Sequence, residues 1–187
     1  MARIDAVQAT ANRALIVKEA SSLLRSHGLQ RITIAHVMRA AGLIPGSFYI
    51  YFESEESLAA EACERAFRDV AQCWRKVGMA AQAEGSDVCK ALVEHYLEPK
   101  LAEQTCPMLA LAETARRPGL NGSLHVAYRA GVQLLMETFL ELVAPGSETA
   151  ERSRLVRKFF SMVGENLLIS TASERSEVPA LSYRDRG

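Results

Sequence analysis

The 187-residue sequence lacks the features that mark several large classes of protein. It has no run of 18 apolar residues, so we expect no membrane-spanning helix, and its first 15 residues have no apolar core of the secretory type. Its four cysteines form no C-x-x-C pair, and no histidine stands at a zinc-ligand spacing from them. We therefore expect a cytoplasmic protein with free, mostly buried thiols and no bound metal.

Catalytic motifs are also absent. There is no G-x-S-x-G nucleophile motif and no glycine-rich phosphate loop. The four histidines (His27, His36, His95 and His125) are dispersed, and no cysteine or carboxylate set near them in the sequence indicates a catalytic triad. We expect no catalytic residue, no cofactor and no enzyme activity.

The formal net charge is zero, but the charge is segregated along the chain. Residues 1–52 contain six Lys and Arg against two acidic residues, a net of +4, whereas residues 53–66 contain five glutamates against Arg65, a net of −4. A basic N-terminal quarter suits an anionic partner such as nucleic acid. The alternative is a chance fluctuation of charge in a short segment.

Apolar residues recur at helical spacing through nearly the whole chain, which predicts an all-α fold of about nine helices. Three short helices are expected in a domain over 1–53, and longer ones in a second domain over 54–187. Gly28, Gly42 and Pro99 are expected helix ends, and Thr33 and Ser54 are expected N-caps. The later helices are expected at about 55–79, 88–98, 108–116, 121–143 and 149–172, with a flexible tail over 174–187.

The segment 42–52, GLIPGSFYIYF, has an unusual composition for a helix. Gly42 suits a chain reversal, and Pro45 suits the first turn of a helix, where its missing N–H is no loss. Phe48 and Phe52 are four residues apart and are expected to anchor the segment, while Tyr49 and Tyr51 point elsewhere. After the helix that precedes it, the segment is typical of the second helix of a helix-turn-helix. The alternative is a tight corner between helices.

Residues 33–62, TIAHVMRAAGLIPGSFYIYFESEESLAAEA, closely resemble the TetR family of bacterial transcriptional regulators. The family pattern opens with Thr and continues through A-G-[VL]-x-x-G-x-[FL]-Y-x-[YH]-F to a short spacer that ends in Ser. The matching positions here are Thr33, Val37, Ala41, Gly42, Leu43, Gly46, Phe48, Tyr49, Tyr51, Phe52, Ser54, Glu56 and Leu58. With the preceding helix end, LLRSHGLQ, the resemblance covers about 47 residues, all in register.

The resemblance implies a ligand-responsive, DNA-binding regulator, most simply a repressor. Such proteins are homodimers that place two helix-turn-helix units in successive major grooves of a palindromic operator and release it when a small molecule binds the helical body. The positions that the resemblance assigns to DNA contact are Thr33, Ala35, His36, Pro45, Gly46, Ser47, Tyr49, Ile50 and Tyr51.

Three departures from the family pattern bear on DNA binding. Position 44 is usually Ser or Thr and caps the recognition helix, but here it is Ile44. Position 55 is often Lys, but here it is Glu55, and no Lys or Arg occurs between residues 40 and 64. We therefore expect a modest salt dependence of binding, unless Arg3 and Arg13 supply phosphate contacts. The acidic segment also leaves open a second function, in which a TetR-like protein with weakened DNA binding sequesters a ligand or another protein.

The body is expected to carry the ligand pocket and the dimer interface. The two amphipathic helices at about 121–143 and 149–172 would pair with their copies as a four-helix bundle; the alternative is that they pack only within one chain. The candidate ligand contacts, each of which could instead be plain core, are Trp74, Tyr96, Met108, Leu111, Phe139, Met162 and Asn166. The effector is expected to be small and largely apolar or aromatic.

Overall fold

The computed structural model describes residues 6–29, 32–98, 105–112 and 122–176, with side chains up to residue 165. These described segments are helices and connecting turns, as predicted. Eight α-helices and one 3-10 turn occur in them: α1 (Ala6–His27), α2 (Ile34–Ala40), η2 (Pro45–Ser47), α3 (Phe48–Tyr51), α4 (Glu55–Ala83), α5 (Val88–Leu97), α6 (Pro107–Ala110), α8 (Ser123–Val143) and α9 (Thr149–Ser176). None of the helices in this part of the chain is long and apolar enough to cross a membrane.

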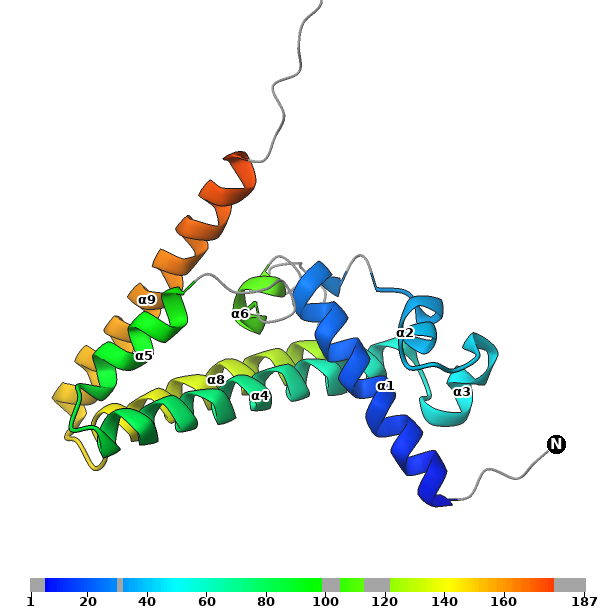
Figure 1. Cartoon of the computed structure of the whole chain (residues 1–187), viewed down its shortest axis with the longest axis horizontal. Coiled ribbons are helices and arrows are strands. Elements are labelled where there is room, and N and C mark those ends of the chain that lie inside the picture. The colour runs from blue at the N-terminus through cyan, green and yellow to red at the C-terminus, as the bar shows by residue number, and fades with distance from the viewer. Residues whose placement is uncertain (1–5, 30–31, 99–104, 113–121, 177–187) are drawn as a thin grey trace, which may run out of the picture.

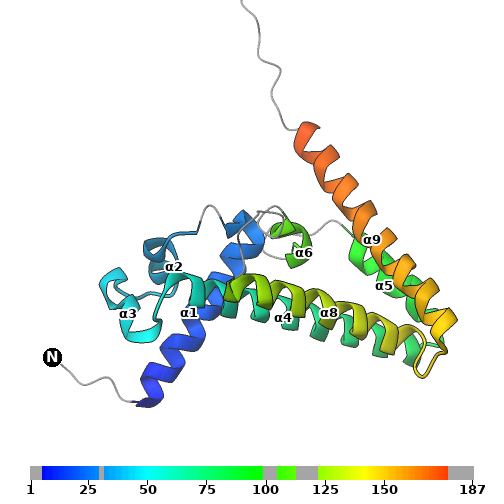
Figure 2. The ribbon, with the colours of Figure 1, turned by 180° about the vertical axis from the view of Figure 1, so that it is seen from behind.

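Helices α1, α2 and α3 form a head at one end of the molecule, and α5 and α9 lie together at the other end (Figure 1). The long helices α4 and α8 lie side by side and connect the two ends, as the view from behind also shows (Figure 2). One continuous cluster of buried hydrophobic side chains extends from Ile16 in α1 to Met162 in α9. The head and the body therefore share a core.

Helices α4 and α8 run parallel and approach closely. Near their first residues, the Ser123 hydroxyl donates to Glu56 Oε1 at 3.2 Å. Near the middle, a Cβ added to Gly131 of α8 would lie 2.1 Å from the ring of Phe67 on α4, so only glycine fits at this crossing. The absent side chain allows the two backbones to come together over a buried aromatic ring.

The expected helix ends were right near the head and less accurate in the body. Helix α4 continues to Ala83, beyond the expected 79, whereas α5 begins at Val88 as expected, after Asp87, whose carboxylate accepts from the Lys90 N–H at 3.0 Å. Helix α6 ends at Ala110 rather than at 116, and residues 113–121 lie outside the described residues. Helix α9 continues to Ser176 instead of ending at 172, and the rest of the expected flexible tail, 177–187, also lies outside them.

Candidate nucleic-acid interface

The first part of the candidate interface is the start of α2. Thr33 has extended backbone angles, and its hydroxyl accepts from the His36 N–H at 3.2 Å, so the expected N-cap is confirmed. This cap satisfies one of the amide groups that an isolated helix start leaves unpaired. His36 is exposed in the first turn and Ala35 is half-buried.

The turn after α2 reverses the chain at Gly42, whose φ is +70°. The Leu43 N–H donates to the Met38 carbonyl at 2.8 Å, and the Gly42 N–H donates to the Arg39 carbonyl at 2.9 Å, which closes the helix end. No described atom lies within 4 Å of a Cβ built on Gly42. The position thus favours glycine because of its backbone conformation and not because of crowding.

The recognition segment consists of η2 followed by α3, with Pro45 in the first turn as expected. Ile44 occupies the N-cap position, where its hydrocarbon side chain cannot accept a hydrogen bond, so the expected loss of a cap is confirmed. The Ser47 hydroxyl instead donates back to the Ile44 carbonyl at 2.7 Å. The segment is held by this local bond and by its buried side.

The inner side of the segment is aromatic and buried. Phe48 is fully buried and stacks on Phe52, with 5.6 Å between the ring centroids, as the four-residue spacing predicted. The outer side carries three large exposed side chains: Ile44, Tyr49 and Ile50 have exposed fractions of 77%, 71% and 66%. Sequence reasoning treated Ile44 only as a missing cap and did not predict that its apolar side chain is exposed.

Tyr51 is placed differently from Tyr49. It is half-buried, and its hydroxyl accepts from Asn12 Nδ2 of α1 at 3.0 Å. Its carbonyl accepts from Arg13 Nε at 3.3 Å. Tyr51 therefore fastens α3 to α1 in addition to any contact it makes outside the protein.

Arg13 connects α1 to both α3 and α4. Its guanidinium lies 4.6 Å from the centroid of the Phe52 ring and forms a bidentate ion pair with Glu61 of α4, with Nη1 2.7 Å from Oε2 and Nη2 also bonded to Oε1. Sequence reasoning considered Arg13 only as a phosphate contact. Its charge is instead neutralised by Glu61, and no short-range spacing could have indicated a pair 48 residues apart. Arg3, the other expected phosphate contact, lies outside the described residues.

The start of α4 places acidic side chains beside the recognition segment. Ser54 and Ser57 form the expected capping box, in which the Ser54 hydroxyl accepts from the Ser57 N–H at 3.1 Å. Glu55 and Glu56 occupy the first turn, where the helix dipole favours negative charge. Glu55 is exposed, so the position that often carries a cation in the family presents a carboxylate to solvent.

The body contains an aromatic cluster to which α4, α5, α8 and α9 each contribute one ring. Trp74 lies 5.8 Å from Tyr96 and 6.1 Å from Phe159, and Phe159 lies 5.7 Å from Phe139, between ring centroids. All four are buried. The structure thus brings together three of the predicted ligand-contact residues and adds Phe159 of α9.

The other predicted ligand contacts are close to this cluster or undescribed. Met108 and Leu111 are buried at α6, where the Tyr128 hydroxyl donates to the Met108 carbonyl at 3.1 Å. Met162 is buried on α9, and the side chain of Asn166 lies outside the described residues.

A short polar path leads from the body to the head at α6. Tyr96 and Cys106 lie close together, and burial raises the pKa of both groups, so both stay protonated at neutral pH. One residue earlier in the chain, the Thr105 carbonyl accepts from Arg25 Nε of α1 at 2.7 Å. The end of α1 therefore contacts the same short segment that packs on Tyr96.

Comparisons with known proteins agree with this arrangement. The family model "Bacterial regulatory proteins, tetR family" matches residues 16–62. The crystal structure of reduced E. coli NemR is similar to this chain with a TM-score of 0.67, at 15% identity over 87% of this chain and 89% of that one, and this likeness shows the fold. A gamma-butyrolactone receptor described as ArpA-like covers 86% of this chain and 98% of its own at 14% identity, with a TM-score of 0.35. No curated protein sequence matches the chain. Over residues 16–62, the chain is therefore similar to the TetR family of bacterial regulatory proteins.

Proposed function

We propose that this protein is a DNA-binding transcriptional regulator that acts as a homodimer on a palindromic operator. Its simplest mode is repression, relieved when a small molecule binds the body. The observation that carries the proposal is the recognition segment: buried Phe48 and the Arg13 contacts hold it in place, while Ile44, Tyr49 and Ile50 remain exposed. A monomer without a partner gains nothing from three large exposed hydrophobic side chains within seven residues.

The proposed DNA contacts are Thr33, Ala35, His36, Pro45, Gly46, Ser47, Tyr49, Ile50 and Tyr51, with Ile44 added. The Tyr49 hydroxyl can donate to a phosphate oxygen or a base edge, and the apolar side chains can contact thymine methyl groups in the major groove. His36 and Arg39, both exposed on α2, are groups able to carry positive charge in the head.

A direct test measures binding of the DNA that flanks the protein's own gene, by fluorescence anisotropy against a scrambled duplex. We expect Tyr49→Ala to weaken specific binding at least about tenfold, since one good base-reading contact is worth about 1–3 kcal/mol. Met79→Ala is the matched control, because Met79 is 65% exposed near the far end of α4. Equal affinity of the wild-type protein for specific and scrambled duplexes would contradict the proposal.

The salt dependence of binding gives a second measurement. Each phosphate contact adds about 0.9 to the slope of log affinity against log salt concentration. Because residues 40–64 contain no Lys or Arg and Arg13 is paired with Glu61, we expect a small slope for this head. Arg39→Gln should lower the slope by about one unit if Arg39 contacts a phosphate.

We assign the dimer interface to α8 and α9, covered by the same helices of a second copy. Val126 of α8 and Phe160 of α9 are 65% and 52% exposed in the single chain. Phe160→Glu should convert a dimer to a monomer in size-exclusion chromatography with light scattering, because it places a charge in an apolar contact. Met79→Glu, an equally polar change at an exposed residue of α4, should leave the dimer intact.

The effector site is proposed to lie among the aromatic residues of the body, with Trp74, Tyr96, Met108, Leu111, Phe139, Met162 and Asn166 as candidates. Aromatic rings and a thioether favour a small, largely apolar or aromatic effector. A compound that binds there should raise the thermal midpoint of the protein and lower its affinity for the operator. A compound that does only the first is a ligand without a regulatory role.

A second function rests on the acidic start of α4. With Glu55 exposed and Arg13 paired, the head has few cations near the recognition segment, which suits a protein that sequesters a ligand or a partner instead of binding DNA. The anisotropy experiment separates the two functions. Loss of specific DNA binding with intact effector binding would favour sequestration.

A further inference from the structure

Cys73 differs from the other cysteines of the chain. It is exposed on α4, whereas Cys63, Cys89 and Cys106 are buried, in line with the expectation of mostly buried thiols. Its Sγ lies 3.4 Å from His95 Nε2 of α5. On the other side of the same imidazole, Nδ1 lies 3.7 Å from Glu98 Oε2. A thiol, an imidazole and a carboxylate thus stand in a row.

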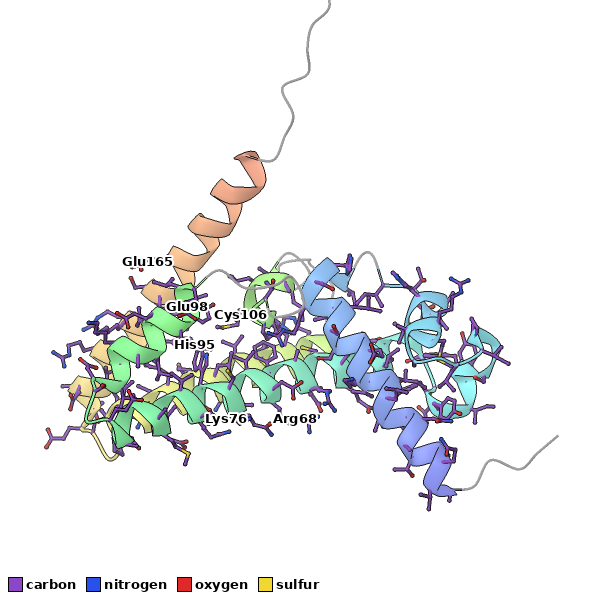
Figure 3. All side chains as sticks on the ribbon, viewed as in Figure 1. Arg68, Lys76, His95, Glu98, Cys106 and Glu165 are labelled. Atoms are coloured by element: carbon purple, nitrogen blue, oxygen red, sulfur yellow. The ribbon has the colours of Figure 1, made fainter. Side chains whose placement is uncertain are left out.

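The packing of two helices creates this row. Helix α5 packs against α4, which brings His95 to a cysteine 22 residues earlier in the chain. His95 and Glu98 are three residues apart and lie on one face at the end of α5 (Figure 3). His95 therefore meets Cys73 in space although the two residues are 22 positions apart in the sequence.

The geometry fits an activated nucleophile. Such sites are recognised by a nucleophile within hydrogen-bond reach of a base that a third group orients. His95 is about one-quarter exposed, so a small molecule can reach the pair from solvent. In the described part of the chain, no three His, Cys, Asp or Glu side chains are arranged to hold a metal ion, so the row suits proton transfer better than metal binding.

We propose that Cys73 is a modification site that adds small activated alkenes, meaning alkenes conjugated to a carbonyl, with His95 as its base and Glu98 as a positioning residue. In this addition the sulfur forms a bond to the β-carbon and the C=C π bond breaks. The thiol proton moves to His95 Nε2 and from there to the α-carbon. Nothing else is consumed or released, and the reaction is independent of DNA binding.

The buried cysteines serve as an internal reference. Burial raises the pKa of the Cys63 thiol to about 12 and also raises the pKa of the Cys106 thiol, so both remain protonated at neutral pH. A protonated thiol is a poor nucleophile, and burial also blocks access. In the folded protein, Cys73 is therefore expected to react alone.

The test measures the rate of N-ethylmaleimide addition at each cysteine by peptide mass spectrometry, in native protein and in denaturant. Each rate is divided by the rate at which N-ethylmaleimide adds to glutathione in the same solution. Exposure alone cannot make a native thiol faster than the same thiol in the unfolded chain. We expect native Cys73 to react about tenfold faster than unfolded Cys73, since a free thiol is only a few per cent thiolate at neutral pH. A native rate at or below the unfolded rate overturns the proposal.

Two variants distinguish the role of His95 as a base from the effect of nearby positive charge on the reactivity of Cys73. His95→Gln should reduce the native rate of Cys73 to the unfolded rate or below it, while Cys63, Cys89 and Cys106 stay protected and so report an intact fold. Lys76→Gln is the matched control, because it removes a positive charge three residues from Cys73 on α4 without touching the base. An equal loss in both variants would show a general field effect and overturn the role of His95.

Two conservative substitutions test the role of Glu98. Glu98→Gln should slow the reaction of Cys73, and Glu98→Asp should retain more of the rate, because it keeps the carboxylate. Equal rates in the two variants would remove Glu98 from the proposal and leave the Cys73–His95 pair.

Discussion

The two ends of α4 are held by different forces. Near its start, polar and directional contacts dominate: the Ser54–Ser57 box, the bidentate pair of Glu61 with Arg13, and the bond from Ser123 to Glu56. Toward its end, apolar packing is more extensive, with Trp74 in the aromatic cluster and Gly78 against Leu142, where an added Cβ would lie 3.0 Å from Cδ2, although Arg75 Nη2 also donates to the Thr138 hydroxyl at 3.3 Å.

This difference suits the two tasks that we propose. Directional hydrogen bonds and ion pairs fix orientation, which a recognition segment needs if its side chains are to meet base edges. Apolar packing is less directional than ion pairing, and a core tolerates repacking when its total volume is kept, which suits a site that accommodates an effector. The predictions below test this contrast, starting from the largest effect.

The aromatic cluster should dominate the stability of the body. Phe159→Ala removes a fully buried ring that contacts Trp74 and Phe139, and we expect a loss of about 3–5 kcal/mol in the free energy of unfolding. Chemical denaturation followed by circular dichroism measures it. Met79→Ala, at an exposed residue, should change the same quantity by less than about 0.5 kcal/mol.

The crossing of α4 and α8 should reject any side chain at Gly131. Gly131→Ala should destabilise the fold by about 1–3 kcal/mol because its methyl group meets the Phe67 ring. Gly164→Ala in α9 is the matched control, since no described atom lies within 4 Å of its added Cβ, and it should stabilise by about 0.5–1 kcal/mol. If Gly131→Ala instead stabilised the protein, α4 and α8 would be able to move apart at this crossing without a cost in free energy.

Arg13 should matter more for DNA affinity than for stability. Arg13→Ala breaks contacts with Tyr51, Phe52 and Glu61, but the ion pair is partly exposed, so we expect only about 1 kcal/mol of lost stability. Operator affinity should fall about tenfold, because α3 is no longer fixed relative to α1. Lys18→Ala, whose partner Glu19 is its neighbour in sequence, should change neither quantity. A loss confined to stability would assign Arg13 a purely structural role.

The missing cap gives the smallest effect. Ile44→Ser restores a hydroxyl at the N-cap of the recognition segment and should raise stability by about 0.5–1 kcal/mol. Ile44→Ala removes the same hydrocarbon without adding a cap and should give no gain. If Ile44 contacts DNA, both variants should lose operator affinity, which separates its two possible roles.

The head was largely predictable because its signals are local. Thr33, Gly42, Pro45 and Ser54 each act within a few residues of their own position, so short patterns locate the caps and turns. The spacing of Phe48 and Phe52 likewise identified the buried side of the recognition segment. A specific family pattern covers the same residues.

The body was less predictable because its important contacts are between distant residues. Periodicity placed the helices but could not show that Phe159 completes a cluster with rings from three other helices. The Arg13–Glu61 and Cys73–His95 contacts are separated by 48 and 22 residues, so neither leaves a mark in local spacing. Such contacts depend on how the helices cross, which a single sequence does not specify.

The unbroken length of α4 has a mechanical consequence. Its 29 residues span about 44 Å at 1.5 Å per residue, and both the recognition segment and the aromatic cluster are attached to it. A rigid rod of that length that pivots by about 5° at one end moves its other end by about 4 Å. That displacement is close to the spacing of about 3.4 Å between successive nucleotides along a DNA strand. A pivot of a few degrees at the body end of α4 would therefore displace the head by about the spacing of one base pair.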